Sequence, residues 1–123
     1  MSEYIELFAN SDDVIREYRA PKDALLGARV WLAWYGYLDY AGSSLVIFEK
    51  DGVLYEVNGS HCSCDDLEGQ WEPEETSWAA LYVRKIPGPN AYFDGEEEAN
   101  TLLQRLVAEH YEPPARMRSK KGR

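Results

Sequence analysis

Two cysteines and a histidine come together in the short run His61-Cys62-Ser63-Cys64. Thiolates and imidazoles are good zinc ligands, and a structural zinc site needs four of them. The chain has only two cysteines and two histidines, so His61, Cys62, Cys64 and His110 would all have to meet at one point. The run therefore predicts either a small zinc-binding module or, more plainly, a structural corner where a strand enters a loop.

Thiol chemistry is a second interpretation of the same run. Cys62 or Cys64 beside His61 could form a thiolate–imidazole pair. Residues adjacent in sequence seldom have the geometry that a nucleophile and its base require, and nearby carboxylates disfavour a thiolate. Neighbours two apart also rarely form a disulfide. We therefore expect free thiols in a reducing cytoplasm, with no catalytic residues.

Acidic residues follow this run directly, from Asp65 to Glu75. They belong to a longer segment, residues 51–83, that contains no lysine or arginine. The spacing of the acids does not match an EF-hand loop. A tryptophan among carboxylates is typical of a surface that binds a basic partner, although a solvated face is the plainer explanation. The residues predicted to bind the partner are Asp65, Asp66, Glu68, Trp71, Glu72, Glu74 and Glu75.

The charge is unevenly distributed over the 123 residues, which include 22 acids and 13 bases. Five of the bases lie in residues 113–123, which contain no acid, so residues 1–112 carry 22 acids against eight bases. We expect a single domain over 1–112 and a basic, disordered tail over 113–123. The composition argues against general nucleic-acid binding and against a membrane span, and no signal peptide is evident.

Local patterns predict the elements that would position these residues. Ser11 is the predicted N-cap of a helix whose first turn holds the acids after it, and a short helical piece is expected over Lys22–Leu26. Val30–Tyr37 reads as a buried aromatic strand, followed by a turn around Gly42. Asp51-Gly52 between two β-rich runs predicts a hairpin.

The second half of the chain predicts two helices. Pro73 before acids suits a helix start within Trp71–Thr76, and helical spacing continues to about Val83. Asp94 is expected to cap the last helix, with Glu97 close to a capping-box position. Apolar side chains follow its 3.6-residue period at Ala99, Leu102, Leu103, Leu106 and Val107, and His110 lies on the same stripe.

These patterns together predict an α+β fold: a small antiparallel sheet of about three strands packed with N-terminal, middle and C-terminal helices. In the aromatic strand, Trp31, Ala33, Tyr35 and Tyr37 would share one face, and Leu32, Trp34 and Gly36 the other. Aromatic residues on both faces indicate either burial on both sides or one exposed patch, and burial is the better explanation.

The strings LYEVNGSHCSC (54–64) and LEGQWEPEET (67–76) resemble a family of small uncharacterised proteins carried by bacteriophages, prophages and bacteria. The resemblance covers about residues 30–81, and Asp65-Asp66 departs from the aromatic-glycine pair typical of that position. It implies a small cytoplasmic accessory protein and transfers no catalytic residues. We therefore expect a non-enzymatic modulator or trigger in phage–host conflict, which binds a basic host protein such as a defence or nucleic-acid enzyme through its acidic, tryptophan-bearing surface. A zinc module using His61, Cys62 and Cys64 is the alternative, and a thiol enzyme is less favoured than either.

Overall fold

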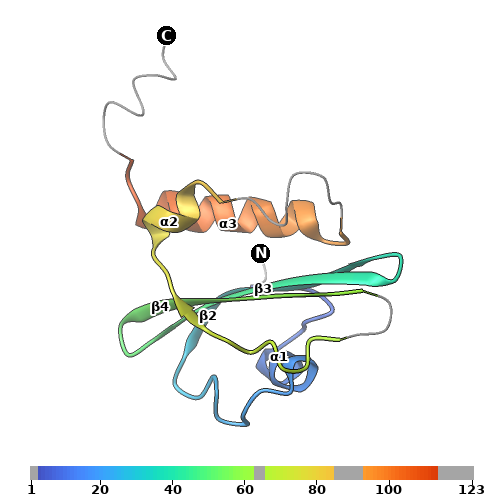
Figure 1. Ribbon diagram of the computed structural model, residues 1–123. Helices are drawn as coiled ribbons and strands as arrows, with labels where there is room; N and C mark the ends of the chain where they lie inside the picture. The colour runs from blue at the N-terminus through green and yellow to red at the C-terminus, as the bar shows by residue number, and fades with distance from the viewer. Residues whose placement is uncertain (1–2, 63–65, 85–92, 114–123) are drawn as a thin grey trace.

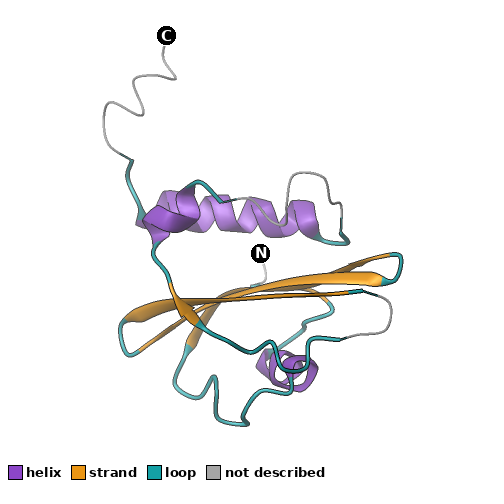
Figure 2. Ribbon diagram, in the orientation of Figure 1, coloured by secondary structure: helices purple, strands orange, loops and turns teal. Residues whose placement is uncertain are grey.

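The computed structural model describes residues 3–62, 66–84 and 93–113 of the chain. One mixed sheet forms its middle layer, with a helix on one face and two helices on the other (Figures 1 and 2). In chain order the elements are β1 (Tyr4–Glu6), α1 (Ser11–Tyr18), β2 (Arg29–Leu38), β3 (Ala41–Lys50), β4 (Val53–His61), β5 (Glu74–Glu75), α2 (Trp78–Tyr82) and α3 (Glu96–His110).

The α+β class is confirmed, but the sheet has five strands in the order β1-β2-β3-β4-β5 rather than about three. Strands β2, β3 and β4 form the antiparallel centre that the alternation predicted. The two additional strands lie at the edges: β1 pairs with β2 in parallel, and β5 pairs with β4. The prediction missed both because runs of two or three residues are too short to show a period of two.

The β3–β4 hairpin forms at Asp51-Gly52, as predicted. Its turn residues have φ angles of 54° and 80°, and positive values at both positions are what a two-residue hairpin turn of type I′ requires. The turn before it was wrongly placed at Gly42. The chain reverses instead at Asp39-Tyr40, where Asp39 has a φ of 56°, and Gly42 lies inside β3 opposite His61.

A β-bulge at Trp31 changes the face that this side chain occupies. Val30 pairs with Phe48 and Leu32 with Ile47, so Trp31 is an extra residue in β2. The predicted faces hold for Leu32, Ala33, Trp34 and Tyr35, but Trp31 was assigned to the wrong face. It lies on the side of α2 and α3, with its ring 5.7 Å from that of Trp78.

Both faces of the sheet are covered, so the aromatic strand is buried on two sides. On one face α1 and the loop residue Leu67 close a core that contains Tyr18, Tyr35 and Phe48. On the other face α3 closes a core around Trp34 with its apolar stripe. Trp34 is 0% exposed and Tyr35 1% exposed, although the two are adjacent in the chain. Alternation of side chains across β2 explains this arrangement.

Before α3, the helices differ from the prediction at three points. The N-cap of α1 is Asn10, whose side chain accepts a hydrogen bond from the Asp13 amide, and not Ser11. Residues 22–26 form consecutive turns instead of a helix. Extended chain and β5 occupy 71–76, whereas α2 follows where helical spacing predicted it. In residues 3–62, 66–84 and 93–113 no helix is long and apolar enough to cross a membrane.

The start of α3 is set by the sheet instead of by an aspartate cap. Gly95, with a φ of 76°, is the N-cap residue, and no side chain caps the helix there. Asp94 uses its backbone: its amide donates to the Tyr37 carbonyl at 2.8 Å, and its carbonyl accepts from the Trp34 indole at 2.8 Å. These two bonds attach the beginning of α3 to β2, so tertiary contacts decide where the helix starts.

Candidate functional site

His61 lies at the end of β4, where its ring contacts the tyrosines of β2. Its Nε2 is 2.8 Å from the Tyr35 hydroxyl, and its Nδ1 is 2.9 Å from the carbonyl oxygen of Cys62. The Tyr35 hydroxyl is also 3.3 Å from that of Tyr37. We call the group of Tyr35, Tyr37, His61 and Cys62 the His61 corner.

The hydrogen bonds of the His61 corner define the state of the ring. A carbonyl oxygen only accepts, so Nδ1 carries a proton, and in the neutral ring Nε2 is left as an acceptor for the Tyr35 hydroxyl. Burial raises the pKa of Tyr35, and the adjoining Tyr37 hydroxyl raises it further. Tyr35 therefore remains a neutral phenol, whose single hydroxyl proton can be donated either to His61 at 2.8 Å or to Tyr37 at 3.3 Å.

This arrangement does not favour the predicted zinc or thiol chemistry. Both nitrogens of His61 are already bonded, so a zinc ion or a thiol would have to displace Tyr35 or the Cys62 carbonyl. His110 lies on the other face of the sheet, where its ring stacks on Trp78 and its Nδ1 is 2.7 Å from the Leu106 carbonyl. Cys64 lies outside the described residues, and within those described no three His, Cys, Asp or Glu side chains are grouped to hold a metal.

The distinctive sequence from Leu67 to Trp71 anchors the loop that returns from the His61 corner. Leu67 is fully buried in the α1-side core, and Gly69 has a φ of 82°. The Gln70 amide bonds to both backbone groups of Ser60, accepting from the nitrogen at 2.9 Å and donating to the oxygen at 2.8 Å. Gln70 thus occupies the free edge of β4 much as another strand would.

Trp71 belongs to this anchor and not to an exposed surface. Its ring stacks on Phe48 at a centroid distance of 5.8 Å and an interplanar angle of 9°, and its edge contacts Tyr18 at 5.4 Å. The side chain is half-buried against the α1-side core. The apolar and amide residues of the LEGQW part of the motif, Leu67, Gln70 and Trp71, therefore have a structural explanation.

The predicted acidic residues are divided into two groups by the structure. Asp66 and Glu68 lie beside α1, where Arg19 at its C-terminus is 3.9 Å from the first carboxylate and 3.2 Å from the second. Since both ion pairs are exposed, each contributes little to stability, but they partly neutralise these two acids. Asp65 lies outside the described residues.

Glu72, Glu74 and Glu75 form the second group, which we call the acidic edge. All three are exposed, and β5 places Glu74 opposite Glu56 and Glu75 opposite Tyr55 at the border of the sheet. No ion pair involves them within the described part of the chain. The structure therefore leaves these three carboxylates open to solvent, in contrast to Asp66 and Glu68.

Glu56 has a role that the sequence analysis did not assign. It is the only charged residue that is buried among those described, with 7% of its surface exposed. Its carboxylate binds Arg84 and accepts a hydrogen bond from the Asn58 side-chain amide. Its place on the same side of β4 as Leu54, facing α2, is the signal that could have identified it. The Glu56–Arg84 pair holds the end of α2 against β4.

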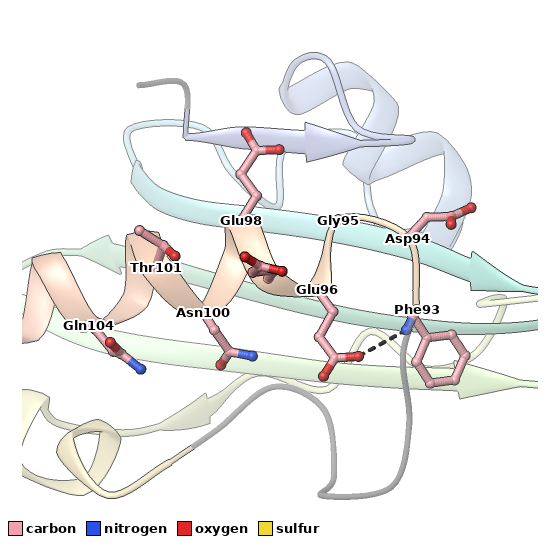
Figure 3. A pocket seen from close by; sticks show the side chains of 9 residues that line it. Phe93, Asp94, Gly95, Glu96, Glu98, Asn100, Thr101 and Gln104 are labelled. Atoms are coloured by element: carbon pink, nitrogen blue, oxygen red, sulfur yellow. Dashed lines mark hydrogen bonds between the residues drawn. The ribbon is translucent and has the colours of Figure 1, made fainter.

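A second acidic surface lies at the start of α3, as Figure 3 shows. Asp94, Glu96, Glu97 and Glu98 line an open hollow of about 920 Å³ together with Asn100, Thr101 and Gln104. The Glu96 carboxylate accepts a hydrogen bond of 2.9 Å from the Phe93 amide. Acids in the first turn of a helix interact favourably with its dipole, so helix stability accounts for this group.

No protein-family model matches this chain, and no curated protein and no solved structure matches it at a significant level of similarity.

Proposed function

We propose that this protein is a non-enzymatic accessory protein of the bacteriophage type, which acts by binding a basic surface of a host protein. The acidic edge is its proposed contact surface. The observation that carries the proposal is the position of Glu72, Glu74 and Glu75 at the border of the sheet, exposed and without an ion-pair partner in the described residues.

Electrostatics supports a basic partner for this surface. Residues 51–83 contain eight acids and no lysine or arginine, so no cation of the same segment offsets the field of the acidic edge. A concentrated negative surface accelerates encounter with a positive one and disfavours negatively charged partners. Proteins that bind nucleic acids present such positive surfaces, so a host protein of this class is the proposed target.

Rigid attachment to the fold is the second support. Trp71 is stacked in the α1-side core on one side of the acidic edge, and Trp78 packs against Trp31 on the other. Surfaces held by a scaffold lose less conformational entropy on binding than free segments do. In this proposal Trp71 positions the carboxylates instead of contacting the partner.

The test begins with tagged protein used to capture partners from a host lysate, followed by purification of any stoichiometric partner. Binding is then measured for the triple variant Glu72→Lys, Glu74→Lys, Glu75→Lys. A matched triple variant, Glu3→Lys, Asp23→Lys, Glu97→Lys, changes the net charge equally at exposed positions elsewhere.

We expect the edge variant to bind at least about tenfold more weakly and the control to bind within about twofold of wild type. Circular dichroism and thermal unfolding establish that both variants are folded. A folded edge variant that retains wild-type affinity would refute the proposal, as would equal losses in the two variants, because those would indicate only a general charge effect.

A further inference from the structure

An apolar groove lies between α2 and the C-terminal half of α3. Tyr82 and Val83 line it from α2 and the residue after it, Leu103, Val107 and Tyr111 line it from α3 and its C-cap, and Pro113 also lines it. The groove has a volume of about 850 Å³, and Val83 is 75% exposed at its border. We call it the α2–α3 groove; Figure 1 shows α2 beside the end of α3 from which the chain leaves.

Residues 114–123 continue directly from this groove, since Pro113 is one of its lining residues. They contain five basic residues, no acid and one large apolar residue, Met117. Met117 is four positions after Pro113, a span of at most about 14 Å when fully extended. The Met117 side chain is therefore within reach of the groove from which its own segment departs.

The charges around the groove complement those of this segment. Glu112 lines the groove, whereas Glu109, one turn earlier on α3, lines a separate hollow with Trp31 and pairs with Arg105 at 3.7 Å. Arg84 is the one cation among the described lining residues, and its charge is already paired with Glu56. Arg116 and Arg118 flank Met117 in the sequence, so apolar and basic groups of the segment match apolar and acidic groups of the surface.

We propose that residues 114–123 bind in the α2–α3 groove, with the Met117 thioether against the rings of Tyr82 and Tyr111 and a flanking arginine near Glu112. These rings already lie 5.3 Å apart, and methionine sulfur makes favourable contacts with aromatic rings. Tethering also makes the binding step intramolecular, which corresponds to an effective concentration in the millimolar range.

Binding of this segment would have a regulatory consequence that rests on the proposed function. The ring of His110 stacks on Trp78 at 4.6 Å, so the end of α3 lies beside the chain that follows β5. A segment with five positive charges held beside α2, which begins three residues after β5 ends, would oppose the negative field of the acidic edge and so compete with a basic partner. The docking itself does not depend on any partner.

Selective labelling of methionine methyl groups tests the docking directly, because the chain contains only two methionines, Met1 and Met117. We expect nuclear Overhauser contacts between the Met117 methyl and the ring protons of Tyr82 and Tyr111 in the full chain at low salt. The methyl signal should also be shifted by these rings, and the contacts should weaken strongly in about 1 M salt as the charges are screened.

Two variants make the test specific. Val83→Lys places a positive charge at the border of the groove and should abolish the contacts. The control Leu26→Lys should preserve them, because Leu26 is as exposed as Val83, 74% against 75%. A random-coil Met117 signal without contacts in the folded wild type would overturn the proposal. Contacts that survive Val83→Lys, or that appear only between molecules in a mixed-label sample, would overturn it too.

Discussion

The ring of His61 lies directly over Gly42, its partner on the neighbouring strand β3. A Cβ atom at position 42 would come within about 3.0 Å of three atoms of the ring. The absence of a side chain at this position is therefore what allows His61 to reach across β3 to the hydroxyl of Tyr35. The pair explains a glycine near the start of β3 by close packing, since its φ angle is not positive.

Gly42→Ala should destabilise the protein by about 1–3 kcal/mol, because the added methyl overlaps the imidazole. His61→Ala removes the obstacle, so Gly42→Ala should cost much less in that background. Urea unfolding of the two single variants and the double variant measures this coupling. Strictly additive losses would contradict the packing relationship.

Stability should fall at alkaline pH because of two buried tyrosines. Burial raises the pKa of Tyr18 and of Tyr35 above the ordinary value of 10.0. The unfolded chain then ionises first, so the free energy of unfolding is unaffected below about pH 9 and decreases above about pH 10, by about 1.4 kcal/mol per pH unit for each group.

Urea unfolding at pH 8 to 11 measures this dependence. The hydroxyl of Tyr18 donates to Ser44 at 2.8 Å, so the double variant Tyr18→Phe, Ser44→Ala removes both partners without leaving one unpaired. It should decrease the alkaline slope by about half. A slope equal to that of wild type would show that Tyr18 does not contribute.

Gln70→Ala should destabilise the protein by about 1–2 kcal/mol, because the free edge of β4 at Ser60 loses both of its partners. Gln70→Glu should be no better, since a carboxylate cannot donate to the Ser60 and Asp66 carbonyls. Hydrogen exchange at the Ser60 amide reports the change locally. Gln104→Ala, at an exposed site on α3, is the control and should stay within about 0.5 kcal/mol of wild type.

Trp71→Ala should lower the free energy of unfolding by about 2–4 kcal/mol, since the ring stacks on Phe48 and Tyr18. Tyr40→Ala, at a position that is 78% exposed, should have almost no effect. Thermal unfolding distinguishes the core role of Trp71 from the predicted binding role. Unchanged stability together with lost partner binding would restore the binding interpretation.

Protein purified without chelator or affinity tag should contain far less than one zinc ion per chain, because both nitrogens of His61 are already engaged. Elemental analysis measures the metal, and added zinc should leave the melting temperature unchanged. Stoichiometric zinc that is lost in the variant Cys62→Ser, Cys64→Ser would instead support the zinc module.

Local sequence patterns determined the centre of this fold. Alternation in β2 and β4, the Asp51-Gly52 turn and the 3.6-residue stripe of α3 each depend on residues that are neighbours in the chain. Period and turn chemistry act over a few residues, so they can be read directly from the sequence. The same reasoning identified the base-free acidic stretch, three of whose carboxylates form the acidic edge.

Only the tertiary structure decided which residues meet across longer distances. The bulge at Trp31, the edge strands β1 and β5, and the start of α3 at Gly95 all depend on pairing or packing with segments far along the chain. The neutralisation of Asp66 and Glu68 by Arg19, and the separation of His61 from His110 by the sheet, have the same origin. Residue types set which contacts are possible, whereas the packing of two cores on one sheet selects those that form.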